Sequence, residues 1–305
     1  MLLLTGPTAS GKSAVALALA RITGGEIVCA DAFQLYAGMP TLTAQPTAEH
    51  MAMAPHHLYG SVPLTEEMDA ARFGRLAEAC IVEIKARGRL PIITGGSGLY
   101  IKALTHGLSP LPPGDATLRA ELDGLPPGEL TARLLALDPE AGATVPLANP
   151  RYVQRALEIA TLTGQPVAAQ KTSFAAGPRP GIAGVYLHRD RGELYERINT
   201  RTHQMIAGGV LNEVRGLPSL LSITAQKTIG LRELQSVAAG TLSMEDAIVA
   251  IQQNTRRYAK RQGTWFRRES WMPAVNATGC SAEDIAAEIS RYCTASISTG
   301  VASQT

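Results

Sequence analysis

The 305-residue sequence is poor in aromatic residues, has four cysteines and has no long apolar run, and these shortages exclude several classes of protein. The cysteines form no CxxC pair and no His/Cys ligand spacing, so neither a zinc site nor a disulfide framework is indicated. No apolar run approaches the roughly 20 residues that span a bilayer, and residues 1–4 lack the basic flank and length of a signal peptide. We therefore expect a cytoplasmic protein with no membrane partner. The net charge of +2 is too small to indicate nucleic-acid binding by itself.

The most informative stretch lies near the amino terminus, where GPTASGKS matches the phosphate-binding pattern GxxxxGK[ST] at every fixed position. An apolar run precedes it and a helical apolar pattern follows, as a strand–loop–helix unit requires. The glycines allow backbone N–H groups to turn toward an anion at the positive end of the helix dipole. The lysine adds charge, and the serine hydroxyl is placed to hold a magnesium ion between two phosphate groups. We therefore expect a diphosphate or triphosphate on Gly6, Pro7, Thr8, Ala9, Ser10, Gly11, Lys12 and Ser13, with Ser13 as the metal ligand.

Two polar residues follow other expected strands. Asp31 ends the apolar stretch 26–31, and Ser97 follows the strand expected at 90–94 within a Gly-rich turn. Ligands of open α/β sheets bind at the carboxyl ends of strands, so both residues are expected at the cleft. A loop aspartate that caps the next turn is the alternative for Asp31. The strand at 90–94 ends without an acidic residue, which argues against a motor or switch NTPase.

The order of these elements predicts an α/β fold, a P-loop core with a parallel sheet flanked by helices and an inserted small helical domain. We expect the first part of the core at 1–111, the insert at 112–180, the second part of the core with a basic C-terminal helix at 181–275, and a tail at 276–305. The connection 32–64 reads as irregular, and its His56 and His57 are expected to be structural. Thr65 is a candidate cap for a helix at 66–87. A further strand at 182–188 leads to a helix at 191–207, whose face of Leu194, Ile198 and Met205 also carries Arg201.

Basic residues gather in three places. In the insert, Asn149-Pro150 predicts the start of a helix that carries Arg151, Gln154 and Arg155, where a solvated salt-bridged face explains the pattern about as well as RNA contact. The helix at 210–215 ends in Arg215, expected to neutralise phosphate oxygens. We call the third group the basic stripe, because a helical wheel places it on one side, opposite Tyr258, Trp265 and Phe266. It favours contact with a polyanion over a merely solubilising face, and it consists of Arg256, Arg257, Lys260, Arg261, Arg267 and Arg268.

Several segments together resemble the tRNA dimethylallyltransferase family, also called isopentenyl-pyrophosphate:tRNA transferases. They are GPTASGKS, DAFQLYAGM at 31–39, PHHL at 55–58, GGSGLY at 95–100, GLSPLP at 107–112, RALE at 155–158 and KRQGTWFR at 260–267, in family order. The family often has threonine where Ser97 stands. Because the cysteines offer no spacing for the zinc finger that eukaryotic members can add, the resemblance is to the bacterial type.

The resemblance implies transfer of a dimethylallyl group from its pyrophosphate to the exocyclic amine of the adenosine 3′ of a tRNA anticodon, with magnesium as metal. Asp31 would be the general base, Ser97 would contact base or diphosphate, and Lys12, Ser13 and Arg215 would bind pyrophosphate. The insert would clamp the anticodon stem-loop. The implied tRNA contacts are Asp31, Ala32, Phe33, Gln34, Ser97, Arg119, Arg151, Tyr152, Val153, Gln154, Arg155, Lys227, Lys260, Arg261 and Arg267.

Three alternatives remain open on the sequence. A P-loop small-molecule kinase would use the same loop for ATP and Asp31 as base toward a hydroxyl, but it leaves the basic stripe unexplained. An enzyme that prenylates free adenine nucleotides gives no purpose to the insert. An RNA-binding regulator that senses a nucleotide would bind without turnover. Nothing in the sequence demands more than a monomer.

Overall fold

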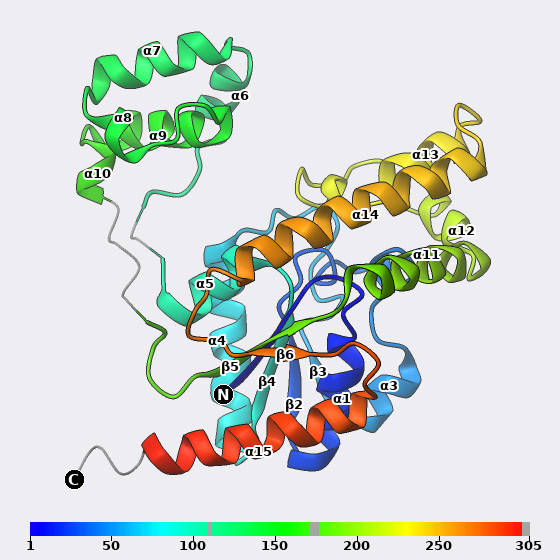
Figure 1. The fold of residues 1–305 in the computed structure, drawn as a ribbon. Coiled ribbons are helices and arrows are strands. Elements are labelled where there is room, and N and C mark those ends of the chain that lie inside the picture. The colour runs from blue at the N-terminus through cyan, green and yellow to red at the C-terminus, as the bar shows by residue number, and fades with distance from the viewer. Residues whose placement is uncertain (109–110, 171–176, 301–305) are drawn as a thin grey trace. The chain divides into compact units, whose positions relative to one another are not determined.

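The computed structural model describes residues 1–108, 111–170 and 177–300. The segment 107–112, the insert expected at 112–180 and the tail expected at 276–305 therefore lie partly outside the described residues, at 109–110, 171–176 and 301–305. The chain divides into two compact units (Figure 1). The larger comprises Met1–Thr105 and Pro178–Thr305, and the smaller, His106–Gly177, interrupts it. The smaller unit contains most of the expected insert but begins before residue 112 and ends before residue 180.

A parallel sheet lies at the centre of the larger unit (Figure 1). The strands found in the described residues follow the spatial order β3 (His56–His57), β2 (Glu26–Cys29), β4 (Pro91–Gly95), β1 (Leu2–Thr5), β5 (Ala183–His188) and β6 (Ala274–Asn276). Every neighbouring pair is parallel, which confirms the predicted α/β fold. Because β4 lies between β1 and β2, the segments that follow these three strands meet at one edge of the sheet.

Both faces of the sheet are covered, as the apolar strands require. Leu2 and Leu4 of β1 face a core that includes α1 (Lys12–Thr23) and α15 (Ala282–Gly300). Leu3 faces the opposite core, which includes α4 (Ala70–Ala86) and α14 (Met244–Phe266). The remaining elements of this unit are α5 (Gly98–His106), α11 (Arg191–Ala207), α12 (Val210–Arg215), the 3-10 turn η1 (Ala225–Lys227) and α13 (Leu231–Ala238). In the described ranges, no helix combines the length and apolar character needed to cross a membrane.

Two local expectations differ from the structure. The connection 32–64 contains α2 (Pro40–Thr43), α3 (Ala48–Met53) and the short β3, which pairs with Ile27 and Val28 of β2. The helix expected at 66–87 begins at Ala70, because the Asp69 side chain accepts the N–H of Arg72 at 2.7 Å and caps it there. Asp69, and not Thr65, is therefore the cap.

The smaller unit is helical, with its own apolar core. It contains α6 (Ala116–Asp123), α7 (Pro127–Leu137), α8 (Ala141–Thr144), α9 (Pro150–Thr163) and α10 (Val167–Gln170). Asn149 caps α9 through the N–H of Arg151, Pro150 stands in its first turn, and Gly164 ends it with a φ of 65°. Asn149 and Pro150 confirm the predicted start of this helix, and the left-handed Gly164 accounts for its end.

Candidate active site

The phosphate-binding motif forms the loop between β1 and α1, as predicted. A side chain at Gly6 would place its Cβ 2.6 Å from the carbonyl oxygen of Leu187, so only glycine allows the loop this close to β5. Gly11 has a φ of 96° and stands directly before the first residue of α1. A cavity of about 330 Å³ opens beside the loop. The loop residues that line it are Thr8, Ala9, Gly11, Lys12 and Ser13, whereas Gly6, Pro7 and Ser10 are buried.

Lys12 is placed to meet an anion in this cavity. Its Nζ donates a hydrogen bond to the carbonyl oxygen of Pro7 at 2.7 Å. Burial lowers the pKa of Lys12 to about 8, and the charge of Arg201 acts in the same direction while that of Asp31 opposes it. The protein therefore holds a lysine whose charged form is poorly solvated, which an anionic ligand would stabilise.

Asp31 follows β2 and lies at the cavity, as predicted. Its Oδ1 accepts the N–H of Phe33 at 3.1 Å, which fixes the turn after the strand. The residue lines the large cavity and also a smaller one of about 70 Å³, together with Arg201. Part of the smaller wall is apolar and comes from Leu42, Met205, Ile229 and Ile251. One carboxylate thus lines both the large cavity and the smaller, partly apolar one.

Ser97 holds the backbone that follows Asp31. Its Oγ accepts the N–H of Ala32 at 2.8 Å, across the gap between β4 and β2. Tyr258 of α14 lies near Ser97, and the pKa of its phenol is raised by burial and by the charge of Asp31. The structure therefore brings Ser97 and Asp31 together through Ala32, and it adds Tyr258, which also lines the smaller cavity.

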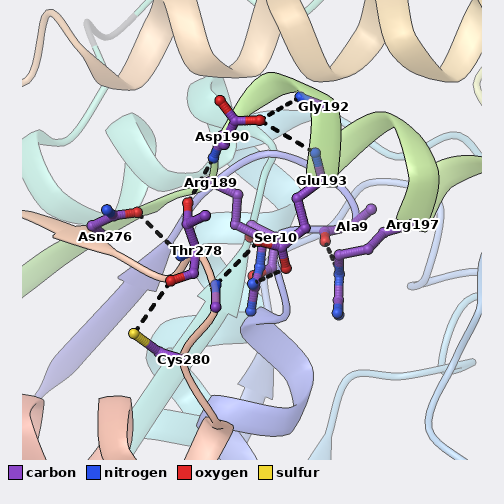
Figure 2. A network of polar contacts seen from close by, with 11 residues as sticks. Ala9, Ser10, Arg189, Asp190, Gly192, Glu193, Arg197, Asn276, Thr278 and Cys280 are labelled. Atoms are coloured by element: carbon purple, nitrogen blue, oxygen red, sulfur yellow. Dashed lines mark hydrogen bonds and ion pairs between the residues drawn. The ribbon is translucent and has the colours of Figure 1, made fainter.

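Two arginines bond the backbone carbonyl groups of the phosphate loop (Figure 2). Arg189 Nε donates to the carbonyl oxygen of Ser10 at 2.8 Å, and Arg197 Nε donates to that of Ala9 at 2.9 Å. Arg189 also pairs with Glu193, whose other carboxylate oxygen accepts the N–H of Gly279 at 3.2 Å. Because these carbonyl groups are bonded to arginines, the loop is held in a conformation whose N–H groups can serve an anion.

A buried glutamine joins the phosphate loop to the Gly-rich turn after β4. Gln262 of α14 accepts the N–H of Thr8 at 2.7 Å and donates to the carbonyl oxygen of Gly96 at 3.0 Å. A Cβ at Gly96 would lie 2.1 Å from Gln262 Nε2, and one at Gly98 would lie 2.4 Å from Trp265 Nε1. The glycines of this turn are therefore required for its close approach to α14.

The structure does not support the role expected of Arg215. Val210 and Val214 of the short α12 are buried in the core, which turns the neighbouring Arg215 toward solvent. Arg215 lines neither cavity. The cations at the large cavity come instead from α11, as Arg197 and Arg201. The signal for Arg201 in the sequence was an arginine on an otherwise apolar helix face.

The residues of the smaller unit that were expected to contact tRNA divide into exposed side chains and side chains with partners inside that unit. Arg151 and Tyr152 are exposed. Arg119 and Arg155 pair with the buried Glu158 at 2.9 and 2.5 Å; burial raises the pKa of Glu158, but these hydrogen bonds outweigh it and keep the pKa below its usual value. Two other residues expected to contact tRNA are also bonded or packed within the smaller unit. Gln154 donates to Asp123 at 2.6 Å, and the side chain of Val153 is buried in the core of the smaller unit.

The basic stripe lies on the second half of α14 and the turn after it. Its members are exposed except for Arg256, which donates to Asn199 at 2.7 Å and lies 5.1 Å over the ring of Tyr195. Arg256 therefore packs α14 against α11, and five cations remain free to meet a polyanion. Lys227, in η1, is also exposed. Ala32, Phe33 and Gln34 are half-buried, and Gln34 holds α2 by donating to the carbonyl oxygens of Thr43 and Ala44 at 2.8 and 2.9 Å.

The two histidines of β3 point in opposite directions, as expected of adjacent strand residues. His57 bonds the buried Glu26 at 2.7 Å, and Arg87 bonds the same carboxylate, so His57 is structural as predicted. His56 lines the large cavity, and burial lowers its pKa. Among the described residues, no group of three or more His, Cys, Asp or Glu side chains is placed to hold a metal ion.

Known proteins resemble this chain over most of its length. The family model described as IPP transferase matches residues 34–269. The tRNA dimethylallyltransferase of Akkermansia muciniphila is 43% identical over 277 residues, which cover 91% of this chain and 93% of that protein. The enzyme of the same name from Anaeromyxobacter dehalogenans strain 2CP-C is 45% identical over 277 residues, covering 88% of this chain and 92% of that protein.

Solved structures agree with these sequence matches. The full-length tRNA isopentenylpyrophosphate transferase from Bacillus halodurans is 33% identical, with a TM-score of 0.74 over 98% of this chain and 97% of that one. A eukaryotic dimethylallyltransferase captured acting on tRNA is 25% identical, with a TM-score of 0.79 over 92% of this chain and 74% of that one. The chain therefore belongs to the IPP transferase family and is an enzyme, a prenyltransferase.

Proposed function

We propose that this protein transfers a dimethylallyl group from dimethylallyl pyrophosphate to the exocyclic amine of the adenosine 3′ of the anticodon in tRNA, in the cytoplasm where tRNA is found. The observation that carries the proposal is the position of Asp31, which lines both the anion cavity and the adjoining, partly apolar cavity. A diphosphate fits beside the phosphate loop. On the other side of the carboxylate, Leu42, Met205 and Ile251 offer apolar contacts that suit a five-carbon chain.

The chemistry needs a base and a stabilised leaving group. The lone pair of an adenine amine is delocalised, so the nitrogen must lose a proton as it bonds to carbon. In the proposed reaction the new N–C bond forms while the C–O bond to pyrophosphate breaks, and Asp31 accepts the proton. Lys12, the loop N–H groups and Arg201 stabilise the charge that grows on the departing pyrophosphate.

The oxygen donors at the large cavity suit magnesium. Mg²⁺ prefers oxygen ligands and keeps several waters, and it is usually held by one or two protein groups together with substrate phosphates. Ser13 Oγ and the Asp31 carboxylate line the cavity, and so does Thr94, whose buried hydroxyl has no protein partner. We propose that Ser13 would hold the ion, which would neutralise charge on the pyrophosphate.

Each unit of the chain offers its own surface for RNA. In the smaller unit, Arg151 and Tyr152 present a cation and an aromatic ring at the start of α9. In the larger unit, the exposed cations of the basic stripe lie along α14. Proteins bind single-stranded RNA loops through phosphate contacts and by stacking on extruded bases, which suits an anticodon loop.

Mass spectrometry of an anticodon hairpin tests the proposal. With dimethylallyl pyrophosphate and Mg²⁺, the hairpin is expected to gain one C5 unit at the adenosine. Asp31→Asn is expected to lower turnover by about 10²- to 10⁴-fold while hairpin binding is kept, because a general base is worth that much. The matched control is Asp284→Asn, since the Asp284 carboxylate accepts the hydroxyl of Ser281 at 2.6 Å in the first turn of α15 and Asp284 lines neither cavity. An unchanged RNA mass together with ATP-dependent phosphorylation of a small molecule would establish the kinase alternative instead.

A further inference from the structure

Thr94, the fourth residue of β4, carries a hydroxyl that the fold itself does not use. The residue is buried, with 4% of its surface exposed. Its backbone carbonyl accepts the N–H of Ala30 at 2.8 Å, as part of the sheet. Its Oγ1 has no hydrogen-bond partner among the described residues. An unpaired buried hydroxyl is unfavourable, so a ligand that pairs with it would remove a cost that the free protein bears.

The position of Thr94 points this hydroxyl toward the anion site. In the sheet, Thr94 lies opposite Leu4 of β1 and Cys29 of β2. Side chains alternate along a strand, so Thr94 shares a face with Ile92, which belongs with Leu4 to the core that includes α1. Thr94 is therefore on the α1 side of the sheet, and it lines the large cavity together with Lys12 and Ser13.

The other unpaired hydroxyl near the loop does not share this position. Ser10 Oγ is also buried without a partner, but Ser10 does not line either cavity. It lies against Gly6 inside the loop, since a Cβ at Gly6 would be 2.9 Å from it. Of these two residues, only Thr94 both has an unpaired hydroxyl and lines the cavity.

We propose that Thr94 is a positioning residue for the metal ion: its hydroxyl accepts a hydrogen bond from a water molecule on the magnesium ion that pyrophosphate binds at Ser13. The inference rests on the proposed function, because it requires a magnesium–diphosphate site in this cavity. Mg²⁺ dehydrates reluctantly, so such waters are present for a neighbouring hydroxyl to hold. Groups that hold the ligands of a metal from behind typically change metal affinity by about 10- to 100-fold when removed.

Thermal unfolding with and without ligands tests this role apart from catalysis. The variant Thr94→Val removes the hydroxyl and keeps the shape, and Thr94→Ser keeps a hydroxyl. Each is heated alone, with pyrophosphate plus EDTA, and with pyrophosphate plus a series of Mg²⁺ concentrations. If Thr94→Val unfolds before it can be measured, Thr94→Ala removes the same group.

We expect Thr94→Val to unfold without ligand at the wild-type temperature or above, because the lost hydroxyl was unpaired. Its shift with pyrophosphate plus EDTA should equal that of the wild type, and the Mg²⁺ concentration that gives half of the further shift should rise by about 10- to 100-fold. Thr94→Ser should restore the wild-type value. The matched control is Thr105→Val, whose buried hydroxyl does have a partner, the carbonyl oxygen of Ile101 at 2.9 Å. It should unfold earlier yet keep both ligand shifts.

Each contrary result has a distinct meaning. A wild-type Mg²⁺ requirement in Thr94→Val overturns the inference and leaves the proposed function intact. Loss of the shift with pyrophosphate plus EDTA overturns it as well, since the hydroxyl would then contact the diphosphate itself. If wild-type protein shows no shift with pyrophosphate under any condition, the diphosphate site of the proposed function fails, and the inference fails with it.

Discussion

The lowered pKa of Lys12 predicts that pyrophosphate binding depends on pH through this one side chain. Burial brings the pKa of Lys12 to about 8 in the free protein. Only the ammonium form offers a positive charge to a diphosphate, and a bound anion raises the pKa again by favouring that form. Pyrophosphate binding should therefore weaken as the pH rises through about 8, and binding near that pH should take up a proton.

The size of the effect follows from the pKa. With a value of about 8, Lys12 is about nine-tenths charged at pH 7 and about one-tenth charged at pH 9, so its contribution should make affinity about tenfold lower at pH 9. An ordinary lysine, with a pKa of about 10.4, would stay charged over this range and contribute no change. At pH 8 the lysine should gain about half a proton on binding.

Isothermal titration of pyrophosphate into the protein, at pH 7 to 9 in buffers of different ionisation enthalpy, measures both quantities. The control is Lys12→Arg, since a guanidinium stays charged throughout. Protonation of pyrophosphate itself affects both proteins alike, so their difference reports Lys12. Equal proton uptake and equal pH profiles in the two proteins would refute the argument.

Three further predictions concern packing around the site and the binding of RNA by the basic stripe. Gln262→Leu leaves two buried backbone groups unpaired and should lower the free energy of unfolding by about 2–3 kcal/mol in urea titrations; unchanged stability would contradict the hydrogen bonds described. Gly98→Ala brings a Cβ to 2.4 Å from Trp265 and should cost about 1–3 kcal/mol, whereas Gly128→Ala, with nothing within 4 Å, should cost nothing. Replacing the five exposed cations of the basic stripe by Gln should reduce the salt slope of hairpin binding by about 3.5; Arg256→Gln should lower stability and change the slope by less than about 1, and the reverse pattern would show that Arg256 is the RNA contact.

Local patterns predicted the parts of this fold that local physics determines. The phosphate loop is defined by its own glycines, and the start of α9 by Asn149 and Pro150, so both could be located from a few adjacent residues. The strands β3 and β6 could not. They are two and three residues long, and they are strands only because they pair with β2 and β5. That pairing cannot be read from the sequence.

A residue that directly follows a strand could be placed at the cavity from the sequence, whereas a residue on a helix could not. Asp31 lies at the cavity because it follows the carboxyl end of β2. Arg215 faces solvent because the buried positions of α12 fix its direction, and Arg201 of α11 stands at the cavity in its place. Val153 stands at helical spacing from Ala156, Leu157 and Ala160, and this apolar face of α9 points into the core of the smaller unit. Gln262 gave no signal, because its partners come from distant parts of the chain.

The two arginines that bond the phosphate loop affect when this loop can reach its final structure during synthesis on the ribosome. Ala9 and Ser10 are synthesised first, but the side chains that hold their carbonyl groups, Arg197 and Arg189, arrive only after the whole helical unit at 106–177 has been translated. A nascent chain or a fragment that stops before β5 carries the complete motif without these supports. These supports of the loop are therefore acquired late, when the carboxyl-terminal half has folded back onto the amino-terminal half.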